Sequence, residues 1–181
     1  MSKTAMFVPA VILAVALTAC DKGQPSGKAA SAGSGAVPPA ISPTLFLTAA
    51  PADAKDVKDA KAAVKAGEKV VLAGRVGGSK EPFVPERAMF TLVDSRLKLC
   101  GENSPEDSCE TPWDYCCDPR EMITANTVTV QVVGPEGQPL KADLNGVHGL
   151  KPTVFVTVVG TVARAEGETM VVNASGLYVR Q

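Results

Sequence analysis

The sequence predicts a mainly β domain, a small five-stranded barrel, from about Ala52 to Gln181, behind an export signal and a flexible tether. Three observations support this. Five runs after residue 68 alternate apolar and polar residues and are rich in β-branched side chains, which suits half-buried strands. Gly160 and Gly176 interrupt the last two runs, and glycines within strands often mark the bends that a small closed barrel needs. Residues 21–44 contain almost no large apolar side chains that a core could bury.

The N-terminal residues Met1–Ala19 have the layout of an export signal. Lys3 supplies an early positive charge, and an apolar run from Ala5 to Leu17 follows, broken only by Pro9. This run is too short for a comfortable membrane span. We therefore expect residues 1–19 to be a signal peptide that is removed on export.

The end of this signal, Leu17-Thr18-Ala19-Cys20, resembles the bacterial lipobox. The resemblance implies that Cys20 is acylated, for example with palmitate, and becomes the first mature residue. Its partner would then be membrane lipid, because two or more acyl chains give stable attachment. The protein is expected in the bacterial cell envelope, lipid-anchored and facing the periplasm, with inner or outer membrane left open.

Residues 20–51 are predicted to be the anchor cysteine and its tether. The stretch DKGQPSGKAASAGSGAVPPAISPT, residues 21–44, consists mostly of Gly, Ser, Ala and Pro. Such a segment buries too little apolar surface to offset the entropy lost on ordering. Leu45-Phe46-Leu47 could dock on the domain or simply end the tether. We place the folded domain at residues 52–181.

The domain opens with a predicted helix, ADAKDVKDAKAAVKAG. Asp53 suits the N-cap, and Val57, Ala60 and Val64 form one stripe at helical spacing. Gly67 is a favourable C-terminal stop.

The five predicted strands follow. They cover Lys69 to Val76, Ala88 to Asp94, Thr127 to Val133, Thr153 to Arg164 and Thr169 to Arg180. Residues 165–168 join the last two as a tight hairpin.

A short helix is predicted between the third and fourth strands, because Leu140, Leu144, Val147 and Leu150 follow helical spacing. Three strands, a helix and two strands is the element order of the OB-fold. The phrases VVLAGRV, FTLVD and VTVVGTVARAEGETMVVNA resemble that family's first, second and last two strands. The resemblance implies a ligand face over the second and third strands and their flanking loops.

A cysteine-rich insert, residues 100–118, lies between those two strands. Cys100, Cys109, Cys116 and Cys117 are an even number of thiols in an exported domain, which favours disulfides. Ring strain disfavours a bond between the adjacent pair. Two pairings remain open: Cys100 with Cys116 and Cys109 with Cys117, or Cys100 with Cys117 and Cys109 with Cys116.

Two alternatives use the same four thiols. Four thiolates could hold zinc or another thiophilic metal, although the C-x2-C knuckle usual in such sites is absent. A thiol-redox role would require a C-x-x-C pair and an activating base, and neither is evident. The segment PWDYCC also resembles part of uncharacterised exported bacterial proteins, which implies no activity.

Trp113 and Tyr115 flank Asp114 within the insert. Together they could form a partner face for a sugar ring or a protein side chain. They could instead cover the barrel end, and we expect this structural role first, because the domain has few large side chains. Asp114 and Asp118 suit turns and solvated loops, with cation binding as the alternative.

The sequence favours a non-catalytic binding or envelope-associated module, with an envelope protein or a glycan as partner and no cofactor. No P-loop, dinucleotide glycine pattern, H-E-x-x-H or nucleophile elbow is present. The single histidine, His148, has no nucleophile in a recognisable setting nearby. A net charge of −1 and few aromatic residues argue against nucleic-acid binding. A metal-binding or thiol-redox protein is the alternative function.

Overall fold

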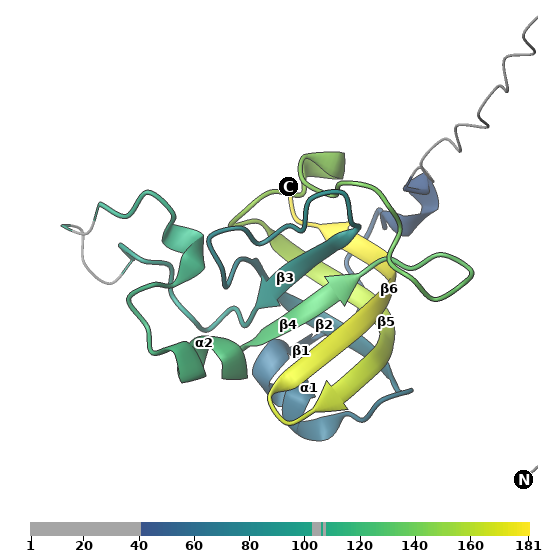
Figure 1. Ribbon diagram of the computed structural model, residues 1–181, viewed down its shortest axis with the longest axis horizontal. Helices are drawn as coiled ribbons and strands as arrows, with labels where there is room; N and C mark the ends of the chain where they lie inside the picture. The colour runs from purple at the N-terminus through teal and green to yellow at the C-terminus, as the bar shows by residue number, and fades with distance from the viewer. Residues whose placement is uncertain (1–40, 103–105, 107) are drawn as a thin grey trace, which may run out of the picture. The chain divides into compact units, whose positions relative to one another are not determined.

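A computed structural model describes residues 41–102, 106 and 108–181 (Figure 1). The predicted signal peptide, Cys20 and the tether up to residue 40 lie outside the described residues. Within those residues, no helix has both the length and the apolar character needed to cross a membrane.

The described chain is mainly β and forms one six-stranded sheet. Its strands are β1 (Lys55–Asp56), β2 (Lys69–Val76), β3 (Met89–Val93), β4 (Thr127–Gln131), β5 (Phe155–Glu166) and β6 (Thr169–Val179). The order is β1-β2-β3-β4-β6-β5, and β5 pairs with β2 as well. The five predicted strands are therefore present. The short strand β1, which pairs with β2 in parallel, was not predicted.

The longest pairing joins β5 and β6, and it contains two register shifts. One shift lies at Gly160, which confirms the irregularity predicted there. A Cβ atom on Gly160 would lie 2.4 Å from the Asn173 carbonyl oxygen, so only glycine fits. Gly176 lies beside the same shift, because Val159 pairs with Gly176 while Gly160 pairs with Ala174.

One hydrophobic core fills the inner side of the sheet. The alternate apolar residues of β2, β3 and β4 are all buried: Val70, Leu72, Val76, Phe90, Leu92, Val128 and Val130. Each fully buried Val, Leu or Phe contributes on the order of 2 kcal/mol from removing apolar surface from water. Period-two alternation therefore identified the core correctly.

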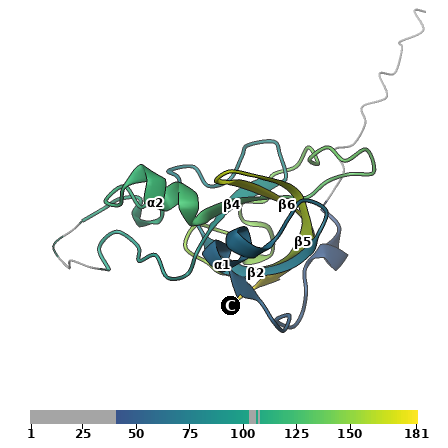
Figure 2. The same cartoon turned by 90° about the horizontal axis from the view of Figure 1, so that it is seen from below.

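The first helix is shorter than predicted. Helix α1 (Val57–Ala63) begins after β1 and ends at the C-cap Val64, before Gly67. The prediction that Asp53 caps the helix is wrong, because the pairing of Lys55 and Asp56 with β2 comes first. Helix α1 lies beside β2 and β4 (Figure 2).

Asp94, at the end of β3, stabilises the start of α1. Its fully buried carboxylate accepts hydrogen bonds from the Lys58 amide at 2.9 Å and from Arg96 Nε at 2.8 Å. Burial opposes ionisation, but the hydrogen bonds from Arg96 and Lys58 outweigh it, so the pKa of Asp94 is lowered. The helix therefore takes its cap from a distant loop.

The other helices also differ from the prediction. Residues 140–150 contain only the 3-10 helix η3 (Val147–Gly149), although Leu144 and Leu150 are buried. The short helix predicted there is wrong because Gly146, His148 and Gly149 all have positive φ, which breaks a helix. A second helix, α2 (Arg120–Ala125), was not predicted. Two further 3-10 helices are η1 (Pro43–Leu45) and η2 (Pro112–Asp114).

The described end of the predicted tether packs against the sheet. Leu45 is buried, and the Leu47 amide donates to the Leu177 carbonyl on β6 at 2.8 Å. The Phe46 ring stacks on His148, with ring centroids 4.0 Å apart. The folded domain therefore includes residues before 52, and His148 has a packing role.

Candidate metal centre

The insert between β3 and β4 extends to one side of the sheet in both views (Figures 1 and 2). Polar contacts attach the insert to β2 and fix its own backbone. Arg75 on β2 forms an ion pair with Glu102 at 3.2 Å, and the Cys100 amide donates to the Pro112 carbonyl at 3.1 Å. Cys100 is thereby held beside the segment that carries Trp113 to Cys117.

Tyr115 fixes that segment to the domain. Its side chain is fully buried, in a small second core with Val93 and Leu97. Burial raises the pKa of Tyr115 to about 12. Its backbone is left-handed, with φ 58°, so the chain turns sharply just before Cys116. Tyr115 therefore has the structural role that was expected first. It cannot belong to an exposed partner face, because no part of its ring reaches the surface.

Trp113 holds the loop that follows β2. Its indole Nε1 donates to the Lys80 carbonyl at 3.1 Å, and its own carbonyl accepts from the Gly78 amide at 2.8 Å. Gly77 permits this approach, since a Cβ there would lie 2.6 Å from the Trp113 carbonyl oxygen. Trp113 is only partly buried. Its partner-face role remains a prediction.

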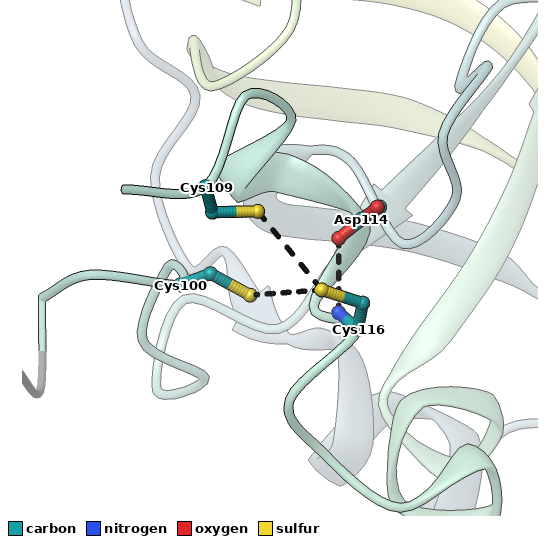
Figure 3. Close-up of side chains that lie close together, drawn as sticks. All are labelled: Cys100, Cys109, Asp114 and Cys116. Carbon is teal, nitrogen blue, oxygen red and sulfur yellow. Dashed lines mark hydrogen bonds between the residues drawn. The ribbon is translucent and has the colours of Figure 1, made fainter. Parts of the chain in front are cut away.

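Three of the four insert cysteines gather with Asp114 (Figure 3). The sulfur atoms of Cys100, Cys109 and Cys116 and a carboxylate oxygen of Asp114 all lie within 4.8 Å of one another. Cys116 Sγ is central, at 3.8 Å from Cys100 Sγ and 3.9 Å from Cys109 Sγ. We refer to these four residues as the thiol cluster.

These separations differ from those of bonded sulfurs. A disulfide requires about 2.05 Å between its sulfur atoms, and the described residues contain no disulfide. Zinc–thiolate bonds of about 2.3 Å in a tetrahedron place neighbouring sulfurs about 3.8 Å apart. The structure does not select between the two predicted disulfide pairings, because Cys116 is almost equally far from Cys100 and Cys109.

Hydrogen bonds distinguish the sulfurs of the thiol cluster. Burial opposes ionisation of Cys100, but hydrogen bonds from the backbone and side chain of Cys117 and from Cys116 outweigh it, so the pKa of Cys100 is lowered. Hydrogen bonding to Asp114, and then to Cys100 and Cys109, raises the pKa of Cys116. Cys100 is therefore the more acidic of these two thiols. Metal ligation by Cys116 would require the loss of its proton.

Asp114 supplies the oxygen of the thiol cluster. Its Oδ1 accepts from the Cys116 amide at 2.9 Å, and its Oδ2 accepts from the Thr111 hydroxyl at 2.8 Å. Burial opposes ionisation, but these hydrogen bonds outweigh it and lower the pKa of Asp114. The turn-forming role predicted for Asp114 is confirmed, since its amide also donates to the Thr111 carbonyl at 3.0 Å.

Sequence reasoning grouped the four cysteines and treated Asp114 separately. The structure instead joins Asp114 to three of the cysteines, while Cys117 contacts Cys100 but is not among the four clustered residues. The D-x-C spacing of Asp114 and Cys116 was the available signal, because the turn brings an aspartate oxygen back to the amide two residues later.

No protein-family model, curated protein or solved structure matches the chain.

Proposed function

We propose that this protein is a lipid-anchored bacterial envelope protein whose OB-like barrel carries a thiolate-rich metal site, with zinc as its ion. The observation that carries the proposal is the position of Cys116 Sγ, 3.8 and 3.9 Å from two other cysteine sulfurs, with an Asp114 oxygen in the same group. This spacing favours metal ligation, the alternative drawn from the sequence, over a loop closed by disulfides.

The donor set favours zinc among common metals. Zinc accepts both cysteine sulfur and carboxylate oxygen, usually in tetrahedral coordination. Copper(I) prefers sulfur alone, whereas calcium and magnesium prefer oxygen. When bound, a zinc ion would supply a rigid link between residue 100 and residues 109–116. That role suits a non-catalytic binding module.

The OB-like barrel is supported by a closed series of strand pairings. Strand β2 pairs with β3, β3 with β4, β4 with β6, β6 with β5, and β5 returns to β2. All these pairings are antiparallel except that of β4 with β6. The insert joins β3 to β4, which would be the second and third strands of such a barrel, beside the usual ligand face. The fold alone names no ligand.

The lipid anchor is supported by the lipobox-like Leu17-Thr18-Ala19-Cys20. Cys20→Ser should abolish metabolic labelling with palmitate and release the protein from the membrane fraction. Continued labelling of this variant would refute the anchor.

Metal content tests the site directly. The full chain should be purified from the envelope without reductant or chelator, and its zinc and free thiols measured. We expect one zinc per chain, lost in Cys116→Ser. Cys117→Ser is the matched control, since it removes the adjacent thiol outside the thiol cluster and should retain the zinc.

Two other outcomes have clear meanings. A metal-free protein whose intact mass shows two disulfides would refute the metal site and restore the stapled-loop hypothesis. Loss of zinc in Cys117→Ser as complete as in Cys116→Ser would show that Cys117, rather than Asp114, provides the fourth ligand.

A further inference from the structure

We propose that the fourth coordination position of this metal site is exchangeable and takes a small oxyanion, a carboxylate or a phosphate. The inference rests on the proposed metal site. Small-molecule pockets have volumes of about 300–1,000 Å³. The oxyanion would enter through the pocket beside the thiol cluster, which has a volume of ≈ 530 Å³.

The pocket opens onto the side of the thiol cluster that Asp114 and Cys116 form. It lies between residues 78–80 and the segment 114–124, and Asp114 and Cys116 line it. Cys100 and Cys109 are not part of its lining. A ligand in the pocket would therefore approach the metal where Asp114 stands and would leave the other two thiolates undisturbed.

Asp114 is a ligand that an incoming oxygen can displace at small cost. Both of its carboxylate oxygens already have hydrogen-bond partners, the Cys116 amide and the Thr111 hydroxyl. These bonds compete with the metal for the same lone pairs. If Asp114 left the metal, its charge would still be stabilised by these partners, so no uncompensated carboxylate would result.

Two cations at the pocket explain why an oxyanion would be preferred over water. Three thiolates on Zn²⁺ leave a negative complex, which by itself repels a further anion. Lys80 and Arg120 line the same pocket, together with Asp118. Trp113 holds the Lys80 backbone in place through its indole nitrogen.

Cobalt substitution tests this inference on the full chain. Co²⁺ bound by thiolates shows sulfur-to-cobalt charge-transfer bands, while its ligand-field bands respond to a change at any coordination position. Inorganic phosphate and acetate would be titrated separately at constant ionic strength maintained with chloride. We expect a saturable ligand-field change with unchanged charge-transfer bands for at least one of the two, and the one that binds more tightly identifies the class.

Charge-removal variants give the matched control. Lys80→Ala and Arg120→Ala should each weaken apparent oxyanion affinity about tenfold. Both variants keep the backbone carbonyls that Trp113 and Thr124 use. Lys151→Ala, which removes an exposed lysine outside the pocket lining, should leave the affinity unchanged.

The two proposals fail differently. Charge-transfer bands without any response to phosphate or acetate would overturn the exchangeable position and leave the metal site standing. A response to chloride alone would also overturn the exchangeable position. So would equal apparent oxyanion affinities in Lys80→Ala, Arg120→Ala and the unaltered protein, because the bound anion would then be an adventitious ion only. Absence of charge-transfer bands would overturn both proposals.

Discussion

The sheet and the insert between β3 and β4 are stabilised in different ways. The sheet combines continuous backbone pairing with one large apolar core. Among its described residues, the insert buries only Tyr115, which packs with Val93 and Leu97, and it depends on polar contacts such as the Arg75–Glu102 ion pair. Exposed ion pairs contribute little to stability. The comparison indicates that pairing and burial stabilise the sheet, whereas the insert has little of either and needs an additional link, which we propose to be a metal ion.

The largest effect should come from the sheet. Phe90 is fully buried on β3, so Phe90→Ala should lower the free energy of unfolding by about 3–5 kcal/mol through lost burial and a cavity. Urea denaturation followed by circular dichroism measures this. Val84→Ala, at an exposed apolar position, is the control and should change stability little. Comparable losses in the two variants would contradict the assignment of the core.

A smaller effect should come from the contact between β3 and α1. The lowered pKa of Asp94 means that its contribution to stability is present above about pH 4, its unfolded-state range, and is lost as pH falls through the lower folded-state pKa. Asp94→Asn should reduce stability at pH 7 by about 2 kcal/mol and flatten this acid dependence. Denaturation at several pH values measures both. If the stability of Asp94→Asn fell with decreasing pH as steeply as that of the unaltered protein, the pH dependence would come from other carboxylates.

Metal removal should separate the two regions most clearly. A chelator should increase amide hydrogen exchange in residues 99–118 while β5 and β6 keep their protection, because only the insert loses its link. Exchange mass spectrometry, with Cys116→Ser as the permanently metal-free control, measures this. Equal loss of protection in both regions would show that the metal supports the whole domain.

The smallest effect should come from one oxygen atom. The Tyr115 hydroxyl is buried without a hydrogen-bond partner among the described residues. Tyr115→Phe should therefore be neutral or stabilising, by up to about 1 kcal/mol, since it removes an unsatisfied polar group and keeps the ring. Thermal unfolding compares it with the unaltered protein. A clear loss of stability would reveal a partner for the hydroxyl, such as a bound water.

The regions also differ in how well the sequence predicts them. Period-two alternation located the five long strands because burial on one face imposes that pattern. Helical spacing, by contrast, predicted a helix wrongly at residues 140–150, where the buried Leu144 and Leu150 lie in a loop turned by Gly146 and Gly149. The limits of α1 depend on pairing with β2, which local propensity does not encode.

The thiol cluster was predictable in composition but not in arrangement. The expected disulfides followed from an oxidising compartment and an even thiol count. Neither observation says how far apart the sulfur atoms lie in the folded protein. Asp114 joins the cluster because Tyr115 is buried in a left-handed conformation and turns the chain. That burial depends on Val93 and Leu97, which precede Tyr115 in the chain, and no spacing within the insert reveals it.

One lysine joins distant parts of this protein. Lys61 of α1 donates through Nζ to the backbone carbonyls of Thr124, Thr127 and Glu168, at 2.7, 3.1 and 2.5 Å. The end of α2, the start of β4 and the hairpin between β5 and β6 therefore share a single ammonium group. A force applied to the insert would therefore reach the hairpin through the Lys61 ammonium group as well as through the pairing of β4 with β6.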